Sequence, residues 1–263
     1  MLPTDRPAIR NSVTAIQRTL AMGPMSGAPF TDRAFLFVAM VPRSGSSYLG
    51  SLIGANGYHM HKETFRLSPR AFDQFVAEHG CATYEDYVRA KIAHSTVNGL
   101  FGAKVGWVHF APLYASGAYA HYFGQAKFVY MTRQDMVAQA ISSYIARQVG
   151  YRHSYQVDDP ARLEEDVPFD FDEISRLIAQ FRDIQSDWEW FFEKEGVTPL
   201  RLTYEALTAD PAAALHAIGG LVDRPMGDSP VVETDIRSVS SGRNARLHAR
   251  YWEELRARGL TSA

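Results

Sequence analysis

The sequence contains a single cysteine, Cys81, so it can form no internal disulfide, and no pair of thiols suggests a zinc site. It also lacks an excess of charge of either sign. The 27 Lys and Arg residues nearly balance the 29 Asp and Glu residues, so no broad attraction to nucleic acid or to an anionic membrane is expected. No sustained apolar segment precedes Phe35, and we therefore expect neither a signal peptide nor a membrane span. We expect a cytoplasmic protein.

The most informative stretch of the chain joins an apolar run to a helical pattern through a loop of small residues. Phe35 to Val41 is uninterrupted by polar residues, as in a strand that is buried on both faces of a parallel sheet. The loop that follows consists of Pro42, Arg43, Ser44, Gly45, Ser46 and Ser47. Apolar residues then recur at helical spacing. A strand, a small-residue loop and a helix N-terminus together predict an anion-binding site.

The loop lacks the lysine that nucleotide triphosphatases place on the β- and γ-phosphates, because Ser46 follows Gly45. Arg43 supplies positive charge from the strand side instead. This composition suits a diphosphate-like or phosphosulfate group better than ATP with magnesium. The alternative is an ordinary strand-to-helix turn, in which Ser and Gly are common.

The rest of the chain alternates between strand and helix patterns. We expect strands at 101–110, 127–132 and 200–203, a short one at 58–60, and helices at 135–147 and 171–195. This alternation predicts an α/β protein with a central, mainly parallel sheet flanked by helices. Residues 1–32 read as a lead-in, partly flexible, and residues 33–263 as one domain. The aromatic stripe of the 171–195 helix is expected to lie in the core.

Several charged residues are candidates for a site at the carboxyl edge of this sheet. Glu63 follows the short strand, where it is either a catalytic carboxylate or the surface ion-pair partner of Lys62 or Arg66. His59 and His61 beside it are alternative bases. Lys104 lies within a strand pattern, where it either reaches an anion or extends to solvent from an edge strand.

Two residues after the 127–132 strand are either the site of a second phosphate, if the helix that follows packs beside the small-residue loop, or otherwise a surface arginine and an ordinary helical serine. Arg133 ends that strand, and Ser142 lies about two turns into the next helix. Arg243 follows a Ser-Gly turn that can fold over a ligand. The polar segment 151–170 is expected to be a mobile loop that acts as a lid or an oligomer contact.

Five segments, in this order and spacing, resemble the sulfotransferases that use 3′-phosphoadenosine 5′-phosphosulfate (PAPS), and most of all the bacterial Stf0 family. The similarity runs from about residue 34 to residue 260. In chain order, the segments are PRSGSSYL at the loop, HKETF, FGAKVGW, KFVYMTRQDMVAQAISSY at the 127–132 strand, and LTYEALTADP. Pro42 and Ser47 depart from the glutamine and threonine that are usual in Stf0 members.

This resemblance implies a P-loop-like three-layer fold and a set of roles. The residues 43–47 would hold the 5′-phosphosulfate, while Arg133, Ser142 and Arg243 would hold the 3′-phosphate. Glu63 would be the catalytic base and Lys104 would offset charge on the transferred group. His61 is an alternative base, because many relatives outside Stf0 use a histidine in this role. The product would be 3′-phosphoadenosine 5′-phosphate (PAP), and no metal would be needed.

The implied acceptor is a carbohydrate or glycolipid hydroxyl, although Trp107, His109, Tyr114 and Tyr151 would equally suit an aromatic or lipid-linked acceptor. Family members are often homodimers. Two alternatives remain open from the residues: a P-loop kinase that acts on a small hydroxyl compound, and a protein that binds PAP without catalysis.

Overall fold

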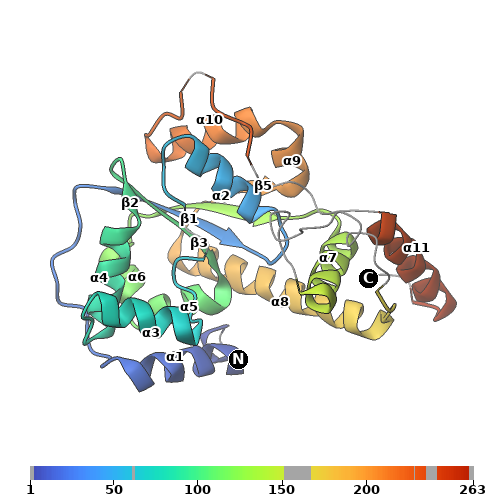
Figure 1. Cartoon of the computed structure of the whole chain (residues 1–263), viewed down its shortest axis with the longest axis horizontal. Coiled ribbons are helices and arrows are strands. Elements are labelled where there is room, and N and C mark those ends of the chain that lie inside the picture. The colour runs from blue at the N-terminus through green and yellow to red at the C-terminus, as the bar shows by residue number, and fades with distance from the viewer. Residues whose placement is uncertain (1–2, 61–62, 151–166, 228, 235–241, 261–263) are drawn as a thin grey trace.

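The central feature of the computed structural model is a sheet of five strands, in the order β2-β3-β1-β4-β5 (Figure 1). The structure describes residues 3–60, 63–150, 167–227, 229–234 and 242–260. The strands are β1 (Ala34–Met40), β2 (Thr96–Val97), β3 (Leu100–Gly106), β4 (Lys127–Thr132) and β5 (Leu200–Thr203). Only β2 runs antiparallel to its neighbour, β3. The expected α/β architecture with a mainly parallel sheet is confirmed.

The order of the strands identifies the edge at which a ligand can bind. From β1 the chain forms β3 on one side of β1 and then β4 on the other side. The register pairs Met40 with Gly106 of β3 and with Met131 of β4, so the three strands end together. Ligands of open parallel sheets bind at the carboxyl ends of strands where the strand order reverses, and the loop after β1 lies at that point.

Helices cover both faces of the sheet. In Figure 1, α2, α9 and α10 lie on one side of it, and α8 lies on the other with α1 and α3 to α6, while α7 and α11 lie side by side at one end. Their bounds in chain order are α1 (Pro7–Thr19), α2 (Ser46–Ala55), α3 (Pro69–Glu78), α4 (Tyr84–His94), α5 (Trp107–Ala115), α6 (Ala118–Tyr122), α7 (Met136–Val149), α8 (Phe171–Glu195), α9 (Tyr204–Ala209), α10 (Pro211–Val222) and α11 (Gly242–Ala257), with a short 3-10 helix at Pro3–Asp5.

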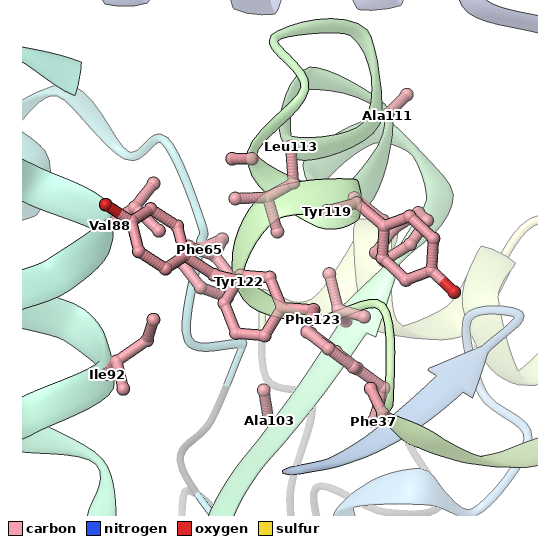
Figure 2. Packing of buried hydrophobic residues seen from close by; sticks show 14 of the residues in the cluster. Phe37, Phe65, Val88, Ile92, Ala103, Ala111, Leu113, Tyr119, Tyr122 and Phe123 are labelled. Carbon is pink, nitrogen blue, oxygen red and sulfur yellow. The ribbon is translucent and has the colours of Figure 1, made fainter. Parts of the chain in front are cut away.

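Alternate residues of β1 enter two different cores, which explains its unbroken apolar sequence. Phe35, Phe37 and Ala39 pack on the α5, α6 and α8 side, and Leu36, Val38 and Met40 pack on the α2 and α10 side. The first core is mostly aromatic, and Figure 2 shows Phe37 beside Phe123 within it. The two rings are 5.1 Å apart, centroid to centroid, and nearly perpendicular.

The long helix α8 has the bounds that its pattern predicts. The carboxylate of Asp170 accepts a hydrogen bond from the Glu173 amide at its start, and Gly196 at φ 64° ends it. Its apolar stripe lies in the core, as expected: the C-terminal part, which includes Trp188, Phe191 and Phe192, packs against the sheet, and the N-terminal part packs with α7 and α11. Buried Asp187 on the same helix forms an ion pair of 2.8 Å with Arg6, just before α1.

Two expectations about local structure are wrong. The strand expected at 101–110 ends at Gly106, and Trp107 begins α5. A short apolar run reads equally well as a buried strand or a buried helix, so sequence periodicity did not find the boundary. The segment 58–60 is not a strand, although it passes so close to β3 that a Cβ on Gly102 would lie 2.3 Å from the carbonyl oxygen of His59. The segment 151–166 lies outside the described residues.

Among the residues that the structure describes, no helix is both long enough and apolar enough to cross a membrane.

Candidate active site

The loop between β1 and α2 has the backbone shape of an anion cradle. Arg43 and Gly45 both adopt left-handed conformations, with φ values of 65° and 84°. The first helical hydrogen bond of α2 runs from the Leu49 amide to the Gly45 carbonyl oxygen, at 3.1 Å. The amides of residues 46–48 therefore have no partner within the helix, and together with the helix dipole they favour a negatively charged group.

The three expected serines of this loop have different surroundings. The Ser46 hydroxyl points inward and donates to the Met40 sulfur at 2.9 Å, so its side chain is used within the protein. The Ser47 hydroxyl accepts a hydrogen bond from Lys104 Nζ at 2.8 Å. The Ser44 hydroxyl is fully buried and has no hydrogen-bond partner among the described residues, which leaves its donor available for a ligand.

Lys104 reaches this loop from the neighbouring strand. It lies opposite Val38 in the β1–β3 register, and only 5% of it is exposed. The snorkelling alternative is therefore wrong, because the ammonium group does not extend to solvent. A buried ammonium beside the small-residue loop adds positive charge to the unpaired amides at the start of α2, which suits an anionic group there.

Helix α7 supports the loop through two contacts. Arg43 Nε donates to the Ser142 hydroxyl at 3.0 Å, and the side-chain amide of Gln139 donates to the Pro42 carbonyl oxygen at 2.6 Å. The sequence predicts that Ser142 and Arg133 hold a second phosphate if α7 packs beside this loop, and α7 does contact the loop, where Ser142 accepts its hydrogen bond from Arg43. Sequence reasoning missed Gln139, because a buried glutamine in an otherwise apolar helical face gives no signal of its partner.

Arg133 follows the last residue of β4 and contacts Tyr204, a ring that also packs on the loop. Its guanidinium is 4.8 Å from the centre of the Tyr204 ring, and its Nε lies 3.8 Å from a carboxylate oxygen of Glu205. That buried Nε has no hydrogen-bond partner in the described part of the chain. The Tyr204 ring packs so closely on Gly45 that a Cβ there would lie 2.6 Å from its Cδ2. Tyr204 was not singled out from the sequence, although it follows the last strand directly.

A groove of about 810 Å³ continues from Arg133 between the β4–β5 edge and α8. Its lining combines the Trp190 ring with charged and amide side chains, among them Arg182, Arg201 and Glu189. Arg201 and Glu189 neutralise each other through two hydrogen bonds of 2.6 and 2.7 Å. The groove therefore extends the site at the Arg133 end, away from Lys104.

Arg243 lies inside α11, not in a turn before it, and only 2% of it is exposed. Helix α11 packs on α7, where His248 lies 3.1 Å from a carboxylate oxygen of Asp135, the residue that caps α7. Arg243 therefore belongs to a helix that contacts the helix carrying Ser142.

The candidate bases lie in the segment after α2. Glu63 has a left-handed backbone, with φ 57°, and its carboxylate is 3.4 Å from the Arg66 guanidinium. Burial lowers the pKa of His59 from its ordinary value, so its ring is neutral at neutral pH. His61 lies outside the described residues. Among the residues that are described, no group of three or more His, Cys, Asp or Glu side chains is arranged to hold a metal ion.

Comparison with known proteins gives three results. The sequence profile described as Stf0 sulphotransferase matches residues 34–254. A trehalose 2-sulfotransferase of Mycobacterium tuberculosis is 32% identical over 110 residues, which cover 40% of this chain and 39% of that protein. The chain thus matches well under half of that relative's length.

Two solved structures show a distant similarity. A sulfotransferase from Alicyclobacillus acidocaldarius has a TM-score of 0.47 and 16% identity, over 85% of this chain and 93% of that one. The sulfotransferase domain of the Synechococcus PCC 7002 olefin synthase has a TM-score of 0.48 and 13% identity, over 88% and 98%.

The profile match begins at the first residue of β1 and continues into α11, so it includes the loop, Lys104, Arg133 and Arg243. With a match over most of its length, the chain belongs to the Stf0 sulfotransferase family of enzymes.

Proposed function

We propose that this enzyme transfers the sulfuryl group of PAPS to a hydroxyl group of a carbohydrate. The observation that carries the proposal is the pairing of two anion-binding elements around Tyr204. The loop after β1, with its unpaired helix-start amides, and the cationic Arg133 after β4 both contact this ring, and a ligand that engages both of them needs two separate anionic groups. An adenosine with phosphates at its 5′ and 3′ positions meets that requirement.

The loop supplies the grip on the 5′-phosphosulfate. The amides at the start of α2, the Ser44 hydroxyl and the Ser47 hydroxyl are donors for its oxygens. Ser46 contributes its backbone amide, because its hydroxyl is bonded to Met40. Gly45 permits the left-handed turn that this approach requires.

The 3′-phosphate is held by Arg133, with Ser142 and Arg243 completing the site from α7 and α11. The Arg133 Nε has a hydrogen bond left to donate, and an arginine binds a phosphate through two parallel hydrogen bonds. Ser142 also accepts a hydrogen bond from Arg43 Nε, so this one side chain connects the loop to the proposed 3′-phosphate site. Selection of PAPS over ATP follows from this second site.

Glu63 takes the proton of the attacking hydroxyl, while Lys104 and Arg43 stabilise the negative charge that develops on the sulfuryl oxygens and on the departing phosphate. Positioning and fixed charges are sufficient for an in-line group transfer of this kind. The carbohydrate acceptor is supported by the trehalose 2-sulfotransferase among the relatives.

The test is an assay with radiolabelled PAPS and a panel of trehalose, maltose and sucrose. We expect label in at least one sugar, and loss of that transfer in Glu63→Gln with PAP binding retained. Glu253→Gln, which removes an exposed carboxylate from α11, is the matched control and keeps its activity. Transfer of the γ-phosphate of ATP to a sugar, with none from PAPS, would overturn the proposal in favour of a kinase. PAP binding without any transfer would favour a non-catalytic protein.

A further inference from the structure

Glu205 places a carboxylate beside the arginine that is proposed to hold the 3′-phosphate. It follows Tyr204 directly, and its Oε1 lies 3.8 Å from Nε of Arg133. Its Oε2 accepts a hydrogen bond of 3.1 Å from the backbone amide of Gln134, the residue after Arg133. The segment after β4 and the start of α9, which are far apart in the chain, therefore hold this carboxylate beside Arg133.

One oxygen of this carboxylate can still accept a hydrogen bond. The 3.8 Å between Oε1 and the Arg133 Nε is too long for one, and within the described part of the chain Oε1 accepts no other. The Glu205 side chain is 35% exposed, so a ligand can reach it. Arg133 and Gln134 also line the groove described above, so the carboxylate lies where that groove begins.

A carboxylate is an unfavourable neighbour for a phosphate site, because like charges repel. Glu205 opposes the binding of a phosphate to Arg133 unless it also makes a favourable contact with the rest of the ligand. The ribose of the proposed donor offers such a contact, because its 2′-hydroxyl is on the carbon next to the one that bears the 3′-phosphate. Acidic side chains accept a hydrogen bond from a ribose 2′-hydroxyl in dinucleotide-binding folds.

We infer that Glu205 accepts a hydrogen bond from the 2′-hydroxyl of the donor ribose and makes the site specific for a 3′-phosphoribonucleotide. The inference rests on the proposed function, since it assigns Glu205 a role at the same donor site. The Tyr204 ring packs on both Gly45 and Arg133, so the sugar that joins the two phosphates lies near this ring and next to Glu205. A phosphate at the 2′ position would meet the carboxylate directly and is therefore disfavoured.

The contact is tested by calorimetric titration with PAP and with 2′-deoxyadenosine 3′,5′-bisphosphate. In wild type we expect loss of the 2′-hydroxyl to weaken binding about tenfold, because a hydrogen bond to a charged group is lost. In Glu205→Ala the two ligands should bind equally. The comparison isolates the hydrogen bond, because the repulsion between Glu205 and the 3′-phosphate acts on both ligands alike.

A third ligand, adenosine 2′,5′-bisphosphate, tests the specificity. We expect the preference of wild type for PAP over this isomer to fall about tenfold in Glu205→Ala, because the carboxylate that repels a 2′-phosphate is gone. Glu193→Gln is the matched control, since it removes another carboxylate from the lining of the same groove. It should change neither preference.

Glu205→Met is the second variant, because it keeps a side chain of similar length and removes both acceptor oxygens. It should give the same ratios as Glu205→Ala, and thermal unfolding shows which of the two variants is folded. Agreement of either folded variant with these ratios supports the inference.

The outcomes separate the inference from the proposed function. If wild type does not bind PAP, the proposed function fails and the inference fails with it. If PAP is bound but the 2′-deoxy analogue binds as tightly, only the inference fails. It also fails if removal of the 2′-hydroxyl weakens binding by the same factor in wild type and in the Glu205 variants, since Glu205 would then only orient Arg133.

Discussion

Replacing Gly45 with alanine should damage donor binding more than any other change of one methyl group in the loop. Gly45 has φ +84°, and an alanine in the left-handed region costs about 1–2 kcal/mol. The added Cβ would also lie 2.6 Å from Cδ2 of Tyr204, so the ring must move. Because Arg133 packs on the same ring, a displacement of the Tyr204 ring disturbs both proposed phosphate sites at once.

We therefore expect Gly45→Ala to weaken PAP binding at least about tenfold, which corresponds to about 1.4 kcal/mol. Calorimetric titration with PAP measures this directly, and thermal unfolding measures the cost to the fold. The matched control is Gly54→Ala in α2, the helix that follows this loop, where a Cβ would meet no atom within 4 Å. That variant should bind PAP normally and be unchanged or slightly stabilised.

The reasoning would be refuted if Gly45→Ala bound PAP with wild-type affinity. It would also be refuted if the two alanine variants lost the same affinity, because the loss would then reflect helix composition and not the contact with Tyr204.

Three further changes have outcomes that follow from single contacts. Gln139→Leu leaves the Pro42 carbonyl oxygen without the donor now 2.6 Å away, and should destabilise the protein by about 1–3 kcal/mol in thermal unfolding and weaken PAP binding; wild-type values in both measurements would contradict the supporting role of α7. Lys104→Met should lower PAPS turnover about 100-fold, because it removes the charge that stabilises the transferred group. It should not lower the melting temperature, because it also removes the cost of burying an ammonium group. An unchanged turnover would argue against this role of Lys104. Burial raises the pKa of Asp187 to about 6, so the folded protein binds this proton more tightly than the unfolded chain does. The free energy of unfolding should therefore fall by about 3 kcal/mol as pH rises from about 3 to about 7. Urea unfolding across that range should show this slope in wild type and its loss in Asp187→Asn, whose neighbour Arg6 keeps Asp183 at 3.1 Å; equal slopes would contradict the assignment.

The parts of the fold that the sequence predicts are those with one dominant periodicity. The β1 strand could be found because both of its faces are buried, and α8 could be found because its stripe is long and ends at Gly196. The start of α5 could not, because its first residues are as apolar as the strand before them. At that boundary the packing of the whole fold, and not the local sequence pattern, determines where the strand ends and the helix begins.

The site divides in the same way. Local features, such as a glycine in a small-residue loop before a helix, indicated the cradle after β1. Which serine hydroxyl remains available for a ligand depends on contacts that form only in the folded chain. The Ser46 hydroxyl donates a hydrogen bond to the Met40 sulfur, and the Ser47 hydroxyl accepts one from Lys104. The contact of Tyr204 with Gly45 joins residues far apart in the chain, so only the folded structure reveals it.

The central claim is that the site recognises an adenosine with phosphates at its 3′ and 5′ positions. Its most direct test is a calorimetric titration of wild type and Arg133→Ala with PAP, with ADP and with ATP plus magnesium. We predict tight binding of PAP, weak binding of ADP, and loss of that preference in Arg133→Ala. Tighter binding of ATP with magnesium than of PAP, or an unchanged preference for PAP in the variant, would contradict it.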